Sequence, residues 1–166
     1  MTKNQLAELL YHWFSMFVTE KEVKKNAKEL GFRIWWRKEK FKKISKELFI
    51  FNMWLIILTC EKVIDDEDKR NECLDIFHNL VYNRNINSNE ISYKDWTISI
   101  SSKYIEFNKA INTEHPSTSL WVVAKVLNRN LFGEVKEDLS FQLKVCSKIG
   151  LFVEHLGKEM LKYDLE

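Results

Sequence analysis

The sequence predicts an all-α fold, a single-domain helical bundle of about six or seven helices around a central hydrophobic helix at about residues 41–63. The first observation is the run from Leu48 to Cys60, which is apolar apart from Asn52 and Thr59. A helix that is hydrophobic all round is one surrounded by other elements. The second observation is that the chain has only four Gly and one Pro, which favours long helices with short connections. The third is a helical spacing of apolar residues along most of the remaining chain.

The length of 166 residues fits one domain covering residues 1–166. A chain of this length is large enough to bury a hydrophobic core. The central apolar run has 13 residues, which is too short to cross a bilayer. We therefore predict no transmembrane segment, and charged residues on both sides of the run fit a helix buried within protein.

The first two helices are predicted from their caps. Thr2 can cap a helix that ends near Val18, with an apolar stripe formed by Leu6, Leu10, Trp13 and Phe17. Thr19 followed by Glu22 matches a capping box, so a short basic helix is expected at about 20–30. Gly31 is placed to end it as the C′ residue.

The middle of the chain is predicted to hold one long helix from Arg33 to Val63, because this stretch contains neither Gly nor Pro. Acidic residues at 65–68 place negative charge where the N-terminus of the next helix favours it. That helix is expected to end near Asn83, where an Asn-rich segment, 83–90, is typical of a loop.

Three helices are predicted in the C-terminal half. Ser92 with Asp95 resembles a capping box, and the helical stripe from Trp96 to Ile111 outweighs a short strand-like alternation around residues 98–100. His115-Pro116 interrupts the chain, since Pro disfavours a helical residue before it. The next helix should end at Gly133, and the last should span roughly 137–163.

Positive charge is concentrated in one segment, Lys21–Lys46, which carries eleven Lys or Arg and three Glu, a local charge of +8. The whole chain has a charge of +2, so the remainder carries −6. Within this segment rings and cations alternate, and we take as candidate binding residues Arg33, Trp35, Trp36, Arg37, Lys38, Lys40, Lys42 and Lys43. Cations neutralise phosphates, and rings stack on bases or lie at a lipid headgroup boundary. The alternative is that a Trp packs inward and the lysines form an ordinary solvated face.

No metal or cofactor site is predicted. Asp75 and His78 are three residues apart on one helix face, as in helical di-iron sites, but such a site needs a second pair, and no other His follows an acid at this spacing. The three cysteines, Cys60, Cys73 and Cys146, are odd in number and far apart, which argues against a disulfide framework. Cysteines without a disulfide framework indicate a reducing compartment. The first residues also lack a signal-peptide pattern, so the expected location is the cytoplasm.

Two functions fit these observations. The first is a non-enzymatic helical binding or interaction protein, with an anionic partner held by the basic aromatic segment 21–46. Single-stranded nucleic acid is the first candidate, an anionic membrane surface the second, and a protein partner or a homo-oligomer is left open. The alternative is a small helical enzyme or ligand-binding protein with an aromatic-lined pocket between helices, where Asp75, His78 or a Cys would act. The absence of a recognisable catalytic constellation favours the first.

Overall fold

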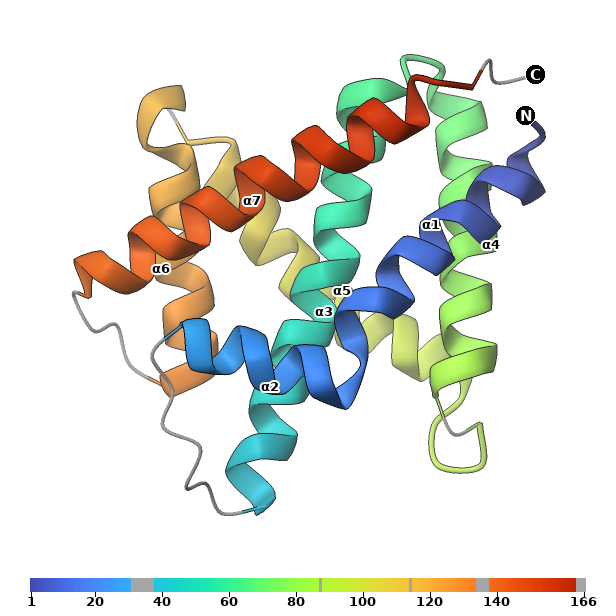
Figure 1. Cartoon of the computed structure of the whole chain (residues 1–166). Helices are drawn as coiled ribbons and strands as arrows, with labels where there is room; N and C mark the ends of the chain where they lie inside the picture. Colours follow the sequence, from blue (N-terminus) through green and yellow to red (C-terminus); the bar gives the residue numbers. More distant parts are fainter. Residues whose placement is uncertain (31–37, 87, 114, 134–137, 164–166) are drawn as a thin grey trace.

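The computed structural model describes residues 1–30, 38–86, 88–113, 115–133 and 138–163, and these ranges form seven α-helices, one short 3-10 turn and no strand (Figure 1). The helices are α1 (Lys3–Val18), α2 (Glu20–Glu29), α3 (Lys38–Val63), α4 (Glu67–Asn85), α5 (Tyr93–Ile111), α6 (Ser119–Phe132) and α7 (Leu139–Met160). The turn η1 (Pro116–Thr118) lies between α5 and α6. The predicted all-α helical bundle is confirmed.

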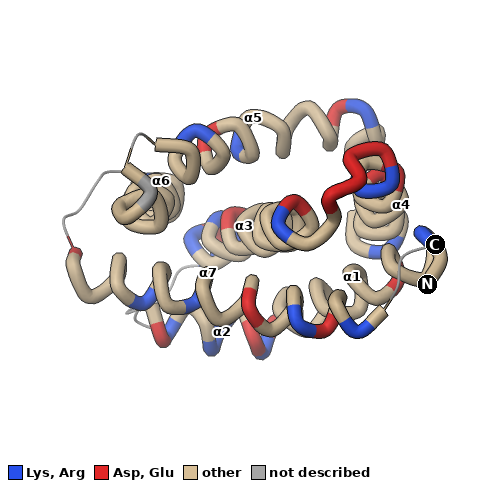
Figure 2. The backbone as a smooth tube through the Cα atoms, turned by 90° about the horizontal axis from the view of Figure 1, so that it is seen from above, with Lys and Arg blue, Asp and Glu red and all other residues tan. Residues whose placement is uncertain are grey.

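Helix α3 lies at the centre of the bundle, as predicted. Seen from above in Figure 2, α1, α2 and α7 cover one side of α3, α5 and α6 cover the opposite side, and α4 closes one end. Within the apolar run, Met53, Trp54 and Ile56 are fully buried. The Thr59 hydroxyl is satisfied inside the helix, because it donates to the Leu55 carbonyl at 2.8 Å. All seven helices contribute residues to one hydrophobic core around α3.

The predicted caps define several helix ends. The hydroxyls of Thr2, Thr19 and Ser92 each accept a hydrogen bond from the backbone N–H three residues later, at 3.3, 3.3 and 3.2 Å. They fix the first turns of α1, α2 and α5, where unpaired N–H groups need acceptors. Gly133 ends α6 with a φ of 84°, a left-handed conformation that glycine adopts without steric cost.

Some predicted boundaries differ from the structure. The long helix predicted from Arg33 is described from Lys38, and its expected start, together with Gly31, lies outside the described residues. Helix α4 continues to Asn85, two residues past the predicted end, and the Ile86 N–H still donates to the Tyr82 carbonyl at 3.0 Å. The helical prediction for residues 98–100 is confirmed by α5. Among the described residues no helix is both long and apolar enough to span a bilayer.

Candidate functional site

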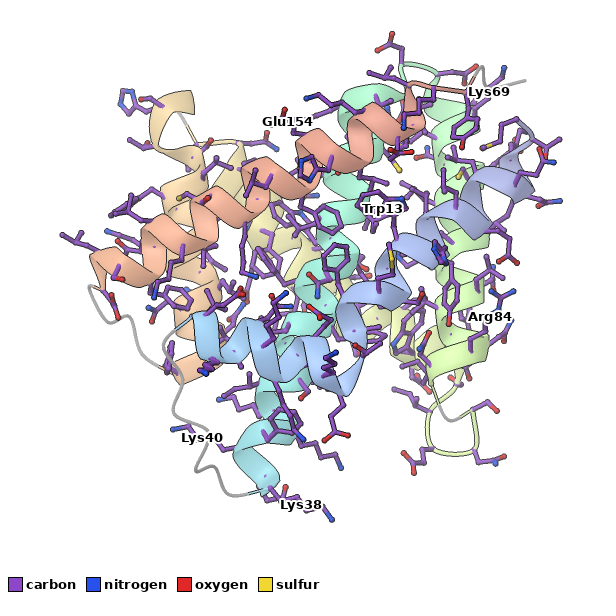
Figure 3. All side chains as sticks on the ribbon, in the orientation of Figure 1. Trp13, Lys38, Lys40, Lys69, Arg84 and Glu154 are labelled. Atoms are coloured by element: carbon purple, nitrogen blue, oxygen red, sulfur yellow. The ribbon has the colours of Figure 1, made fainter. Side chains whose placement is uncertain are left out.

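Exposed lysines gather on α2 and on the first turns of α3. Seven of them form no ion pair with a described residue, and we call this set the lysine face: Lys21, Lys28, Lys38, Lys40, Lys42, Lys43 and Lys46. Figure 3 labels Lys38 and Lys40 near the start of α3, with their side chains directed away from the bundle. The Lys24 ammonium lies 5.8 Å from the Phe41 ring centroid, so the two basic segments are adjacent.

The predicted binding residues divide into two groups. The four lysines Lys38, Lys40, Lys42 and Lys43 are exposed on α3. Lys40 lies about 200° around the helix from Lys38, so it does not share the side of Lys38 and Lys42. Arg33, Trp35, Trp36 and Arg37 lie outside the described residues, so their part in a binding face stays a prediction. Lys38, Lys42 and Lys46 recur every four residues and therefore follow one line along α3.

A groove of about 500 Å³ opens beside this line of lysines, and we call it the basic groove. Lys42 and Lys46 of α3 form one edge, and Glu90 lies on the loop before α5. The rest of the lining is largely apolar and comes from the five helices α1 to α5 and the residues between them, with Val23, Phe49, Ile86, Ile91 and Ile100 among it. The groove thus combines two lysines that have no ion pair with a described residue and a largely apolar floor.

His78 lies at the edge of the core, where it connects α4 to α5 by a hydrogen bond. Its Nδ1 lies 2.7 Å from the Leu74 carbonyl oxygen, which can only accept, so Nδ1 carries the proton. Its Nε2 lies 3.2 Å from the Tyr104 hydroxyl and therefore accepts from it. Burial lowers the pKa of His78, and burial also raises the pKa of Tyr104. Both groups are therefore neutral at pH 7, and Asp75, the predicted companion, is exposed to solvent.

This arrangement predicts a pH-dependent stability. The pKa of His78 is lowered from 6.5 in the folded protein, so the unfolded chain takes up this proton first as the pH falls. The contribution of His78 is complete above the unfolded pKa and is lost as the pH falls from about 6.5 toward the lowered folded value. We expect the free energy of unfolding to decrease between about pH 7.5 and 5.5 in denaturant titrations. His78→Gln should remove most of this decrease, since the other three histidines are exposed; an unchanged pH profile would contradict it.

The described residues contain no group of three or more His, Cys, Asp or Glu side chains that could hold a metal ion. All three cysteines are free thiols. Burial raises the pKa of Cys73 to about 12 and also raises the pKa of Cys60 and Cys146. A thiol with a raised pKa is a poor nucleophile at neutral pH, so none of the three has the environment of an activated cysteine.

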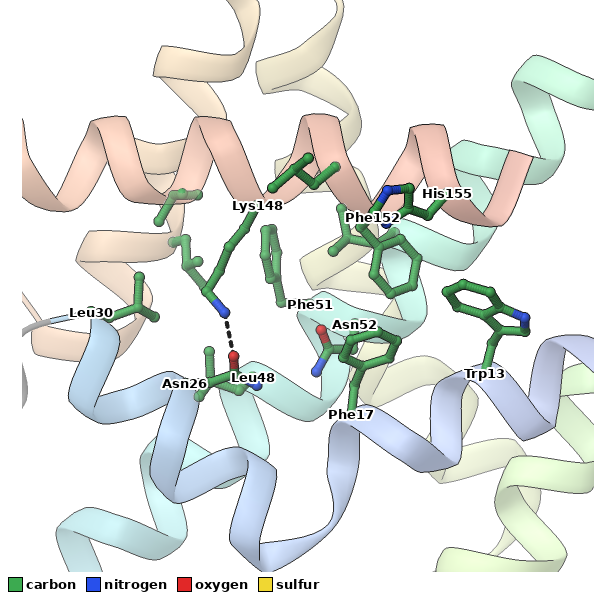
Figure 4. Close-up of a pocket in the computed structure, with 14 residues that line it drawn as sticks. Trp13, Phe17, Asn26, Leu30, Leu48, Phe51, Asn52, Lys148, Phe152 and His155 are labelled. Carbon is green, nitrogen blue, oxygen red and sulfur yellow. Dashed lines mark hydrogen bonds between the residues drawn. The ribbon is translucent and has the colours of Figure 1, made fainter. Parts of the chain in front are cut away.

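A second concavity lies between α1, α2, α3, α6 and α7, and we call it the aromatic pocket (Figure 4). It measures about 180 Å³. Rings from three helices line it: Trp13 and Phe17 from α1, Phe51 from α3 and Phe152 from α7. The Phe17 and Phe152 ring centroids are 5.1 Å apart, and those of Trp13 and Phe17 are 6.3 Å apart. This is the kind of pocket that the alternative functional hypothesis expects.

Comparison with known proteins adds no functional assignment. The chain matches no protein-family model, no curated protein and no solved structure. Function is therefore inferred from the two concavities and from the chemistry of the side chains around them.

Proposed function

We propose that the protein is a non-enzymatic binding protein that holds an anionic partner on the lysine face, with single-stranded nucleic acid as the first candidate. The observation that carries this proposal is the set of seven exposed lysines that have no ion-pair partner among the described residues. Binding an anion there breaks no ion pair between residues that the structure describes. Two other lysines of α2 already form ion pairs: Lys24 with Glu20, and Lys25 with Glu22.

The shape of the lysine face favours an extended anion over a single phosphate. Lys38, Lys42 and Lys46 are spaced along α3 by about 6 Å per step, from a rise of roughly 1.5 Å per residue. The lysines on α2 add charge beside this line. An extended chain of phosphates can contact several of these cations at once and release its condensed counterions, which gives affinity without sequence preference.

An anionic membrane is the second candidate, and the course of α3 weakens it. An interfacial helix lies in the membrane plane with a continuous apolar face. After Lys46 helix α3 continues into the core, where Leu48 and Ile50 are buried, and the next exposed lysine on α3 is Lys62 at its far end. Only the first turns of α3 could therefore contact a lipid surface.

The test is a binding titration that compares two triple variants of equal charge. The first, Lys38→Gln with Lys42→Gln and Lys46→Gln, removes the line along α3. The control, Lys62→Gln with Lys109→Gln and Lys144→Gln, removes three exposed lysines that have no ion pair with a described residue and lie on α3's far end, α5 and α7. Fluorescence anisotropy with a labelled single strand, at low and at physiological salt, measures the affinity.

We expect wild-type protein and the control variant to bind alike, with an affinity that falls steeply as salt rises. The variant with Lys38, Lys42 and Lys46 replaced should bind at least about tenfold more weakly at low salt. The slope of log affinity against log salt concentration should be smaller in magnitude by about 2, because each of the three lost phosphate contacts contributes about 0.7. Equal losses in both variants would contradict a specific face. If the strand does not bind at low salt but anionic liposomes float the protein, the partner is a membrane; if neither binds, the lysine face is only a solvated surface.

A further inference from the structure

The aromatic pocket contains a polar group that the protein itself does not satisfy. Asn52 is one of two polar residues in the apolar run of α3, and it lines the pocket. Thr59, the other, bonds within its own helix. No hydrogen bond joins the Asn52 amide to any described residue. Figure 4 shows this amide beside the Phe17 and Phe51 rings. The Asn52 side chain is only partly buried, so water can bond to its amide in the free protein, and a ligand in the pocket would take the place of that water.

A cation is held at the edge of the same pocket. Lys148 extends from α7 across the pocket toward α2, where its ammonium donates to the Asn26 amide oxygen (Figure 4). The ammonium also lies 3.0 Å from a Glu29 carboxylate oxygen. These two contacts use two of its three N–H donors and fix its position. The Glu29 carboxylate balances the charge of the ammonium, and unlike an anion on the lysine face, a ligand at the third donor shares the cation with this carboxylate.

The pocket-facing side of α7 is continuous. Lys148, Leu151, Phe152 and His155 all line the pocket and follow the spacing i, i+3, i+4, i+7, which places them on one helix face. The side chains of Leu151 and His155 are exposed, so they lie where the pocket meets solvent. The interior is thus aromatic and aliphatic, and its polar side chains are Asn26, Asn52 and Lys148, with His155 at the mouth.

We propose that the aromatic pocket binds a small amphipathic carboxylic acid as a free molecule. Its apolar body lies among the rings of Trp13, Phe17 and Phe152, and its carboxylate accepts a hydrogen bond from the Lys148 ammonium. The Asn52 amide donates to a second acceptor of the same ligand. The volume of about 180 Å³ limits the body to about one ring with a short chain, since an apolar cavity of about 150 Å³ takes benzene. The ammonium makes a charge-assisted hydrogen bond with either head group, and a carboxylate adds Coulomb attraction to it, which the Glu29 carboxylate at 3.0 Å reduces.

Calorimetric titration with 4-phenylbutyrate and its neutral analogue 4-phenyl-1-butanol tests this proposal. We expect the acid to bind the full-length protein about tenfold more tightly than the alcohol, because only the acid adds attraction between opposite charges. Lys148→Met keeps most of the side-chain stem but removes the cation, so it should bring the acid down to the affinity of the alcohol. Lys144→Met is the matched control, because Lys144 is an exposed lysine of α7 that does not line the pocket.

A second variant keeps the test informative if Lys148→Met alters folding. Leu151→Trp adds bulk at the exposed mouth and should abolish binding of both probes, while the circular dichroism spectrum stays unchanged. The proposal would be overturned if neither probe bound wild-type protein at concentrations up to about 5 mM, where a site with a dissociation constant of about 1 mM is mostly occupied. An acid preference that survives Lys148→Met, or binding that survives Leu151→Trp, would also overturn it. The Lys38, Lys42 and Lys46 triple variant should retain binding, which separates this site from the lysine face.

Discussion

Replacing Trp54 by alanine should lower the free energy of unfolding by about 3–5 kcal/mol, the range found for large aromatic truncations in protein cores. Trp54 is fully buried in α3 and is the largest side chain with no exposure. Its ring centroid lies 5.8 Å from that of Phe51 and 5.1 Å from that of Phe107. Its indole N–H donates to the Asn108 side-chain oxygen at 2.8 Å. Alanine would remove these contacts and leave a cavity between α3 and α5.

Denaturant titration of Trp54→Ala and Trp54→Phe separates packing from hydrogen bonding. Phenylalanine retains much of the ring packing but cannot donate to Asn108, so its loss should be smaller, about 1–3 kcal/mol. A loss below about 1 kcal/mol for the alanine variant would show that Trp54 is not a core residue, since core truncations of this size cost several times more.

Phe14→Ala should also cost about 3–5 kcal/mol, because one ring connects three helices. Phe14 belongs to α1 and is fully buried. Its ring meets that of Phe49 of α3 edge-on, with centroids 4.9 Å apart, and that of Phe77 of α4 at 5.8 Å. Edge-to-face pairs of this kind add to the burial of apolar area.

Met16→Ala is the matched control on the same helix. Met16 lies two residues further along α1 and is 41% exposed, so its truncation should change stability by no more than about 0.5 kcal/mol. Thermal or chemical unfolding that gives equal losses for the two variants would contradict the orientation of α1 against α3 and α4.

Local sequence signals were enough to predict most of the fold. A cap needs only the side chain at the helix end and the N–H groups of the next turn, so Thr2, Thr19 and Ser92 could be identified without knowledge of the tertiary structure. Gly133 is equally local, since its left-handed conformation depends on the absence of its own side chain. The central position of α3 followed from the lack of a polar face in Leu48–Cys60.

Helix ends without such a signal were harder to predict. The Asn-rich composition after Tyr82 is typical of a loop, but α4 continues to Asn85. Here Tyr82 packs against Tyr93 and Trp96 of α5, with ring centroids 5.2 and 5.5 Å apart, and its hydroxyl donates to the Ile91 carbonyl. These tertiary contacts hold the last turn of α4 in place against the weak helix propensity of asparagine.

The candidate sites could be predicted only in part, because each depends on residues far apart in the chain. The lysine face is visible in the sequence as a local excess of charge, whereas the floor of the basic groove comes from α1 through α5 and needs the fold. The aromatic pocket is a stronger case. Asn52 is conspicuous in the sequence as a polar residue in an apolar run, but its neighbour across the pocket, Lys148, is known only once α7 lies against α3.

Hydrogen-exchange mass spectrometry, with and without a single-stranded oligonucleotide at low salt, most directly tests the claim that α3 joins a buried core half to an exposed binding half. In the free protein, peptides covering Leu48–Cys60 should exchange slowest, because the amides of a central helix exchange only on global unfolding. Added oligonucleotide should slow exchange in 20–29 and 38–46, and leave α7 unchanged. Exchange in Leu48–Cys60 as fast as in α2, or protection confined to helices without the lysine face, would contradict it.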